Sequence, residues 1–176
     1  MYTKISNPTP PRNSRCSELP AKTKNKIMKG FVKPKSFDAN VVIIVGGSAG
    51  LVASIIAVGA KAKTVLVEKH KMGGDCLNFG CVPTKALIAS AKQAHAMNHG
   101  AKYGVSDVEP TVDYAAAKDH VAATIAAIEP HDSQERFEGL GVKVIREFGR
   151  FISPTEVQAG DHVITARRFV IATGSG

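Results

Sequence analysis

Residues 40–68, NVVIIVGGSAGLVASIIAVGAKAKTVLVE, form the stretch that decides the fold. Residues 40–45 are almost continuously apolar and rich in β-branched side chains, which is typical of a parallel strand covered on both faces. A glycine turn follows, then a helical stretch at 48–60 and a second apolar segment at 64–68. This order predicts a βαβ unit with a right-handed crossover.

A membrane-spanning helix is the alternative for residues 41–60, which carry no charge and are flanked by lysines. The β-branched residues cluster in the first five positions, however, and a glycine pair separates them from the helix-like part. That order favours a strand, a turn and a helix.

The glycine turn, VGGSAG at residues 45–50, matches most of the G-x-G-x-x-G pattern with which a strand-to-helix turn binds a dinucleotide. The second glycine lets backbone amides approach a pyrophosphate, the third lets the helix pack on the strand, and the helix N-terminus offers unpaired N–H groups. Glu68, at the end of the second strand, is placed to accept hydrogen bonds from a ribose. The residues predicted at this site are Gly46, Gly47, Ser48, Ala49, Gly50 and Glu68.

Val45 departs from the pattern, because it stands where the first glycine is expected. A β-branched side chain at a tight turn strains the loop or crowds a ligand. Either binding is weakened, or Gly46 takes over the role through a shifted turn. A glycine-rich turn without a ligand is the remaining alternative, and Glu68 and the cysteine motif argue against it.

The sequence GGDCLNFGCVPTK, residues 73–85, contains two cysteines five positions apart. In a regular helix the rise alone would separate the Cα atoms of Cys76 and Cys81 by about 7.5 Å, whereas a disulfide needs roughly 4.4–6.8 Å. A bridge therefore requires a distorted turn, which Gly80 permits, and a bond held in such a turn is readily reduced. The helix predicted to begin after Cys81 favours a thiolate there, and Lys85 adds positive charge. The spacing indicates a redox-active pair.

Three alternatives for the cysteines are a structural disulfide, a metal-binding pair and two free thiols. A six-residue loop gains little from a crosslink, because loop-closure entropy grows with loop length, and no second cysteine pair completes a zinc site. His95 and His99 are four positions apart, but the neighbouring sequence offers no third ligand, so we predict no metal site.

The remaining pattern changes from helices to strands. A glycine-rich loop is expected at residues 69–80, and helices are expected at residues 82–98, 113–129 and 131–140. Strands are expected at residues 142–146, around Phe151, and at 156–158, 162–165 and 169–173, with a hairpin turn at Gly160-Asp161.

The net charge of +8 belongs to residues 1–37, which carry nine Lys or Arg and one Glu, while the rest of the chain carries fourteen of each sign. This segment is proline-rich and poor in apolar residues, so we predict a basic, disordered tail. We expect no nucleic-acid partner, with membrane contact through the tail as an alternative. The first residues lack an apolar signal-peptide core, and we expect a cytoplasmic location.

The cysteine stretch, extended to GGDCLNFGCVPTKALI, resembles the active-site signature of the FAD-dependent pyridine nucleotide-disulfide oxidoreductases, in particular mercuric reductase-like and dihydrolipoamide dehydrogenase-like members. The similarity runs from about residue 37 to residue 176 and includes FVIATGSG at 169–176, which resembles the family's second FAD segment. It implies an α/β, Rossmann-like FAD-binding domain with a parallel sheet, helices and a C-terminal antiparallel β-meander.

By position, the resemblance implies that Cys81 faces the flavin as its charge-transfer partner and that Cys76 is the exposed interchange thiol that attacks substrate. It also implies Lys85 near the flavin ring, Gly47 and Gly50 at the pyrophosphate and Glu68 at the adenosine ribose. The further residues implied at the FAD site are Lys69, Gly74, Asp75, Ala172, Thr173 and Gly174.

In that family NAD(P)H reduces FAD, FAD reduces the disulfide, and the dithiol reduces the substrate, here expected to be a small-molecule disulfide or Hg(II). Family members are much longer, with a separate NAD(P)H domain and a C-terminal dimer domain that supplies a His–Glu pair to the neighbouring subunit. We therefore expect residues 38–176 to be a truncated FAD-binding domain whose full-length parent is a homodimer. A non-catalytic FAD-binding or apo fragment is the alternative.

Overall fold

The computed structural model of the chain describes residues 34–174. The predicted basic tail, residues 1–37, therefore lies almost wholly outside the described residues, and Cys16 lies outside them as well. Both the tail and the domain boundary at residues 37–38 stay predictions.

Three parallel strands form one half of the sheet. Strand β1 (Ala39–Ile44) leads through helix α2 (Ser48–Gly59) to β2 (Thr64–Val67), which pairs parallel with β1 from Val41 opposite Thr64 onward. Strand β3 (Lys143–Ile145) adds parallel to the other side of β2. The predicted βαβ unit is confirmed, and the single helix considered for residues 41–60 is wrong, because strand β1, a turn and α2 divide that stretch.

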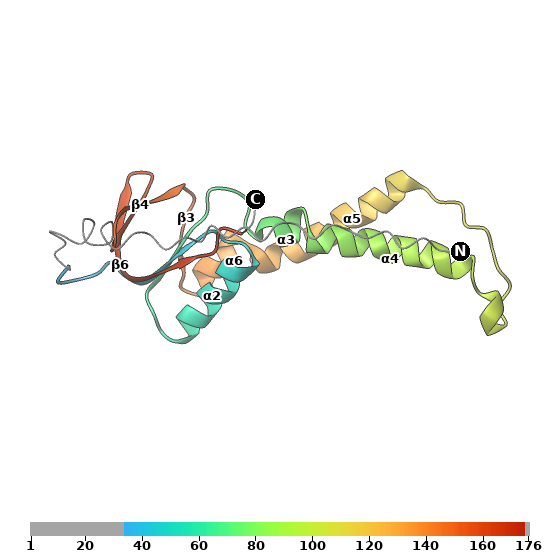
Figure 1. The fold of residues 1–176 in the computed structure, drawn as a ribbon, viewed down its shortest axis with the longest axis horizontal. Helices are drawn as coiled ribbons and strands as arrows, with labels where there is room; N and C mark the ends of the chain where they lie inside the picture. Colours follow the sequence, from blue (N-terminus) through green and yellow to red (C-terminus); the bar gives the residue numbers. More distant parts are fainter. Residues whose placement is uncertain (1–33, 175–176) are drawn as a thin grey trace, which may run out of the picture. The chain divides into compact units, whose positions relative to one another are not determined.

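Strand β6 joins the parallel strands to an antiparallel meander. Strands β4 (Gly149–Ser153), β5 (Glu156–Ala159) and β6 (His162–Ile171) are antiparallel neighbours, and the predicted hairpin turn at residues 160–161 separates β5 from β6. The second part of β6 pairs parallel with β1, so the described sheet has the order β3-β2-β1-β6-β5-β4. Figure 1 labels β3, β4 and β6 of this sheet. The predicted α/β fold is confirmed, although β6 is one strand where two were expected.

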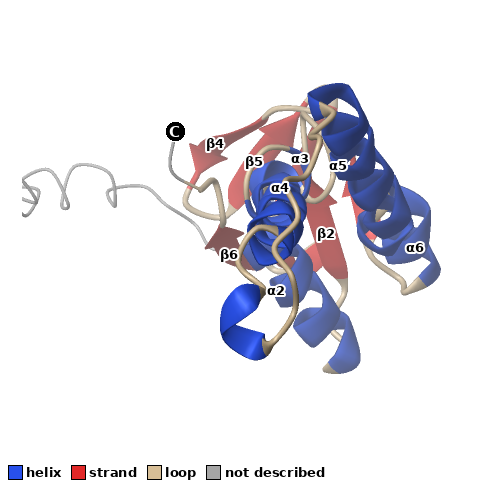
Figure 2. Cartoon of the chain, turned by 90° about the vertical axis from the view of Figure 1, so that its right-hand side faces the viewer, coloured by secondary structure: helices blue, strands red, loops and turns tan. Residues whose placement is uncertain are grey.

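The apolar core has two parts, one on each face of the parallel strands. On one face, Phe137 of helix α6 (Gln134–Gly139) and Leu51 of α2 pack against Ile43 and Leu66. On the other face, residues of the meander such as Val157 pack against β1 and β2. Figure 2 shows the strands β4 and β5 on the opposite side of β2 from α6. Coverage on both faces explains why β1 and β2 are almost continuously apolar.

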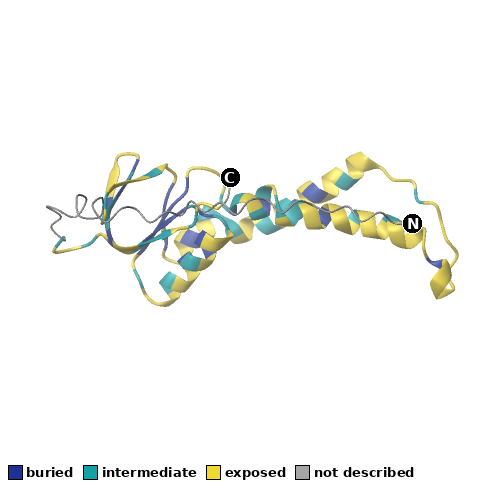
Figure 3. Ribbon diagram, in the orientation of Figure 1, coloured by how far each residue is buried: buried dark blue, intermediate teal, exposed yellow. Residues whose placement is uncertain are grey.

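The cysteine stretch forms helices. A short helix α3 (Gly74–Asn78), which the sequence interpretation assigned to a loop, precedes α4 (Cys81–Met97). A 3₁₀ turn (Ala101–Tyr103) leads to α5 (Tyr114–Ile128), which packs against α4, and a second 3₁₀ turn (Glu129–Asp132) leads to α6. Most of the α4 and α5 surface is exposed (Figure 3). Among the described residues, no helix combines the length and the apolar composition needed to cross a membrane.

A clamp between Asp38 and Thr165 ties the start of β1 to β6, 127 positions later in the chain. The Asp38 carboxylate accepts hydrogen bonds from the Thr165 hydroxyl at 2.7 Å and from the Thr165 N–H at 2.9 Å. These bonds stabilise the charged form, so the pKa of Asp38 is lowered, first by the Thr165 hydroxyl and then by its N–H.

The Asp38 clamp predicts a pH-dependent contribution to stability. Because the folded-state pKa is depressed, the contribution is complete above the unfolded pKa and is lost as the pH falls through the folded pKa. We expect Asp38→Asn to reduce the free energy of unfolding by about 0.5–1 kcal/mol at neutral pH, the value being small because the group is exposed. Denaturant unfolding from about pH 7 to about pH 3 should show this difference narrowing.

The control for that series is Asp161→Asn in the β5–β6 turn, which removes a carboxylate without altering the clamp. If both variants show the same pH dependence, the Asp38 clamp is not its source.

Candidate functional site

A pocket of about 960 Å³ lies at the carboxyl ends of three parallel strands. Ile44, Val67 and Ile171 line it, and they are the last residues of β1, β2 and β6. The chain runs from β1 to β2 and β3 on one side of the sheet and returns with β6 on the other side, so the pocket sits at the point where the strand order reverses. Open α/β sheets bind their ligands at such switch points.

The glycine turn forms the wall of this pocket between β1 and α2. Val45 has a φ of 81°, in the left-handed region, and Gly46 is not among the glycines with positive φ. The turn is therefore not shifted, and Val45 adopts the conformation that a glycine would take without strain. Gly50 packs α2 on β1 as predicted, because a Cβ there would lie 1.9 Å from the Val45 carbonyl oxygen.

The first residues of α2 present their backbone to the pocket. Gly47 is the N-cap residue, and no side chain caps this helix end. Gly47, Ser48 and Ala49 all line the pocket. Unpaired N–H groups and the positive end of the helix dipole therefore lie where a phosphate group can reach them.

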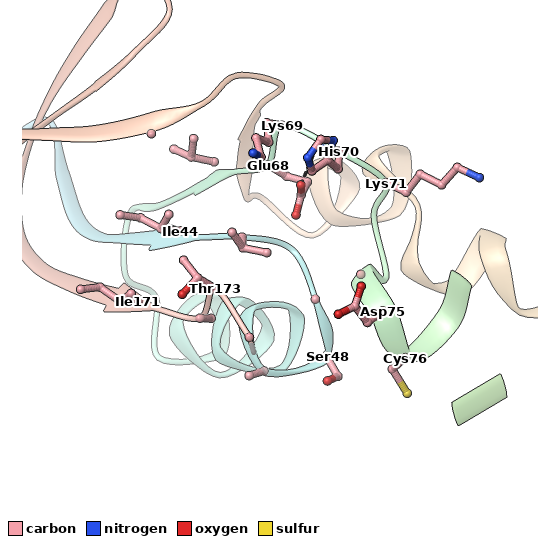
Figure 4. A pocket seen from close by; sticks show the side chains of 18 of the residues that line it. Ile44, Ser48, Glu68, Lys69, His70, Lys71, Asp75, Cys76, Ile171 and Thr173 are labelled. Atoms are coloured by element: carbon pink, nitrogen blue, oxygen red, sulfur yellow. Dashed lines mark hydrogen bonds between the residues drawn. The ribbon is translucent and has the colours of Figure 1, made fainter. Parts of the chain in front are cut away.

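Glu68 is held by two backbone donors at the end of β2. The Gly46 N–H donates to its Oε2 at 2.6 Å and the His70 N–H donates to its Oε1 at 2.6 Å. The residue is only 2% exposed, yet it lines the pocket (Figure 4). A carboxylate has about four acceptor positions, so the fixed group keeps acceptors for hydroxyl groups in the pocket.

The segment that precedes α3 joins the glycine turn through backbone contacts. The Gly73 N–H donates to the Gly46 carbonyl oxygen at 2.9 Å, and Gly47 and Gly73 form a parallel β-bridge. A Cβ on Gly74 would lie 2.7 Å from the Gly47 Cα, and Gly74 also has a φ of 55°. Only glycine permits this contact, which brings the start of α3 to the pocket wall.

A distorted turn between α3 and α4 joins the two cysteines. The N–H groups of Phe79 and Gly80 both donate to the Asp75 carbonyl oxygen, at 2.9 and 2.6 Å, so the chain tightens before α4 begins at Cys81. A Cβ on Gly80 would lie 3.1 Å from that same oxygen. The crowding supports the predicted need for glycine at this turn.

The Cys76 and Cys81 thiols influence each other. The pKa of the Cys76 thiol is raised, mainly by its hydrogen bond to Cys81, and burial and the charge of Cys81 act in the same direction. The positive charge of Lys85 opposes the shift. Cys81 therefore lies close enough to Cys76 to raise the pKa of its thiol.

Most residues predicted at the site come together around the pocket, although they come from separate segments of the chain (Figure 4). The predicted residues that line it are Gly47, Ser48, Ala49, Glu68, Lys69, Gly74, Asp75, Cys76, Ala172, Thr173 and Gly174.

Four predicted residues do not line the pocket. Gly46 is buried behind Met72 and Leu66, and Gly50 lies under the turn. Cys81 and Lys85 lie in the first turns of α4 and are exposed. Cys76, not Cys81, forms the pocket wall, so the implied position of Cys81 against a flavin stays a prediction.

Sequence reasoning missed several residues that line the pocket. Glu147, Phe148 and Gly149 reach it because β3 pairs parallel with β2, which brings the carboxyl end of β3 to the same edge. The rule that the carboxyl ends of parallel strands meet at one edge could have identified these three residues from the sequence. Two exposed aromatic rings also line the pocket, each below a lysine: Phe148 below Lys69 and Phe79 below Lys71.

The histidine pair lies away from the pocket. The rings of His95 and His99 stack with their centroids 3.9 Å apart. Within residues 34–174, no cluster of three or more His, Cys, Asp or Glu side chains has a metal-binding arrangement.

The chain is similar in sequence to dihydrolipoyl dehydrogenases and to a mercuric reductase. Dihydrolipoyl dehydrogenase 2, chloroplastic, of Arabidopsis thaliana is 35% identical over 144 residues, which cover 80% of this chain and 25% of that protein. The dihydrolipoyl dehydrogenase of Chlamydia pneumoniae is 34% identical over 141 residues, 76% of this chain and 30% of that protein. A mercuric reductase of Bacillus cereus is 28% identical over 140 residues, 80% of this chain and 22% of that protein.

The matches thus span less than a third of the length of each of these relatives. The family model described as pyridine nucleotide-disulphide oxidoreductase matches residues 39–176, which include the glycine turn, the cysteine pair and the full six-stranded sheet. The chain belongs to the pyridine nucleotide-disulphide oxidoreductase family.

Proposed function

We propose that the chain is the FAD-binding portion of an NAD(P)H-dependent flavoprotein disulfide oxidoreductase, with Cys76 and Cys81 as its redox pair. One observation carries the proposal: Cys76 lines the pocket formed by the glycine turn and Glu68, and Cys81 lies close enough to raise the pKa of its thiol. The proposed dinucleotide site and the proposed dithiol therefore adjoin the same pocket.

The residues of the pocket fit the FAD that the family implies. Gly47 and Gly74 meet without side chains, so no Cβ stands between a pyrophosphate and the backbone at the start of α2. Ser48 and Ala49 would hold the phosphates at the N-terminus of α2, Glu68 would hold the adenosine ribose, and residues 172–174 would line the opposite side. FAD bound here supplies the exchange of electron pairs between a nicotinamide and a disulfide.

The cysteines would carry the exchange with substrate. The thiolate of Cys76 attacks one sulfur of a substrate disulfide, which forms a mixed disulfide and releases the first substrate thiol. The thiolate of Cys81 then attacks the Cys76 sulfur, which closes the Cys76–Cys81 disulfide and releases the second thiol. The dithiol is oxidised by two electrons, and the substrate is reduced by two.

The raised pKa of Cys76 sets a requirement for this first step. Because the thiolate is the nucleophile, a base must take the Cys76 proton as the attack begins. In the full-length protein we assign this to the His–Glu pair of the neighbouring subunit, within a homodimer that also carries the NAD(P)H domain.

The substrate is a small-molecule disulfide or Hg(II). The name mercuric reductase indicates Hg(II), and the name dihydrolipoyl dehydrogenase indicates a dithiol–disulfide couple, with the exchange run in the direction that oxidises the dithiol. A cytoplasmic location stays a prediction, since one of the similar proteins is named as chloroplastic.

FAD binding by the chain itself tests the cofactor proposal. Quenching of flavin fluorescence on titration with protein should show saturable binding. Glu68→Gln should weaken it roughly 10- to 100-fold, because a hydrogen bond to a charged group contributes about 1.5–3 kcal/mol. Glu156→Gln on the meander is the control. A folded chain, by circular dichroism, that binds no FAD contradicts the proposal.

The contact between the two thiols predicts how alkylation of Cys76 depends on pH. Cys81→Ala removes the main cause of the raised Cys76 pKa, so Cys76 should react with iodoacetamide at a lower pH than in the reduced wild type. Lys85→Met removes the charge that opposes the shift, so it should move the profile to higher pH. Mass spectrometry of the Cys76 peptide provides the measurement.

The same variants separate thiol chemistry from cofactor binding. Cys81→Ser should abolish formation of the Cys76–Cys81 disulfide and leave FAD binding unchanged. Loss of flavin binding in Cys81→Ser would contradict the roles proposed for the pair. The same holds if Cys81→Ala leaves the pH dependence of Cys76 alkylation unchanged.

The glycine contact between the two loops predicts a large effect of one methyl group. Gly74→Ala places a Cβ 2.7 Å from the Gly47 Cα at a positive φ, so we expect a loss of about 1–3 kcal/mol in unfolding free energy and weaker FAD binding. Thermal unfolding with and without FAD measures both.

Gly139→Ala in α6 is the matched control, because nothing lies within 4 Å of its added Cβ. It should raise stability slightly, by about 0.5–1 kcal/mol. Equal effects of the two substitutions would show that the loop contact is not tight.

A further inference from the structure

Val45 holds a backbone conformation that its side chain disfavours. Its φ of 81° lies in the left-handed region, where β-branched residues are rare. The one other described residue outside glycine with positive φ is Lys61, after the end of α2, and it is not β-branched. The strain therefore falls on the residue that links β1 to the glycine turn.

The backbone around Val45 is fixed from both sides. Its N–H donates to the Val67 carbonyl oxygen at 2.8 Å, and its own carbonyl oxygen lies against Gly50. The next residue, Gly46, donates to Glu68 at 2.6 Å and accepts from Gly73 at 2.9 Å. Rotation of φ to a relaxed value would break these contacts, so the surrounding structure maintains the strain.

Val45 lies at the edge of the core and at the wall of the pocket. It is half-buried, packs against the core face that β1 shares with the meander, and lines the pocket together with Gly47. A glycine at this position would leave that volume free for a ligand. The part of its side chain that is not buried therefore lies at the wall that the turn gives the pocket.

We propose that Val45 sets the affinity of this chain for a dinucleotide, because its methyl groups occupy part of the pocket at the glycine turn. This inference rests on the proposed FAD site and deepens it. The backbone strain is the same with and without ligand, since the contacts that fix it do not involve the ligand. Strain therefore lowers stability, whereas side-chain volume lowers affinity.

Two substitutions separate these effects. Val45→Ala removes the γ-methyl groups but keeps a Cβ at positive φ, and Val45→Gly removes both. We expect both variants to bind FAD about tenfold more tightly than the wild type, which corresponds to 1.4 kcal/mol. Only Val45→Gly should relieve the strain, so its ratio of folded to unfolded protein should exceed that of Val45→Ala by about 5- to 30-fold.

The measurements are FAD titration by fluorescence quenching, ADP titration by calorimetry, and denaturant unfolding of the ligand-free full chain. Val52→Ala on the exposed face of α2 is the matched control, because the same two methyl groups are lost away from the pocket. It should leave both affinities unchanged. ADP should show the same gain as FAD, since both carry the pyrophosphate.

Three results would overturn the inference in distinguishable ways. If Val45→Ala and Val45→Gly bind FAD no more tightly than the wild type, Val45 does not set affinity and the proposed function stands. If Val52→Ala gives the same gain, the effect is not local to the pocket. If folded wild type and folded variants all fail to bind FAD and ADP, the proposed function fails as well.

Discussion

The contact between two glycine-rich loops is the constraint on which the site depends. Gly73 donates to Gly46, and Gly74 lies against Gly47 with no room for a side chain. This contact joins the turn after β1 to the start of α3, and so carries Cys76 to the wall of the pocket. Without it, the glycine turn and the cysteine pair would be two separate motifs 26 or more positions apart in sequence.

The sheet supplies the second constraint, because parallel pairing brings several strand ends to one edge. Ile44, Val67 and Ile171 end three strands that pair in register, and the segment after β3 joins them at the same edge. Glu68 then connects this edge to the turn, since its two oxygens accept from Gly46 and His70. The carboxylate is thus a structural link as well as a ligand candidate.

Local sequence patterns predicted the strands, the turn and the cysteine pair, because each depends on neighbours in the chain. The apolar run of β1, the Gly47 and Gly50 positions and the need for Gly80 are features of this kind. Three features escaped prediction for physical reasons. Helix α3 is only five residues long and has little periodicity to detect. Strand β6 is continuous because its first part pairs with β5 and its second part pairs with β1. Phe148 reaches the pocket only because β3 pairs with β2.

The two cysteines lie next to segments that are buried to different degrees. Leu77 of α3 is 2% exposed and lies against Gly73, so the first cysteine is anchored close to the sheet. Beyond Cys81, helices α4 and α5 extend with only Ala86 and Val121 buried between them. Because burial supplies most of the stability of a helix in a protein, amide exchange should be slow in α3 and faster toward the far end of the hairpin. Cys76 and Cys81 therefore lie at the boundary between a firmly packed sheet edge and a helical hairpin that owes little of its stability to burial.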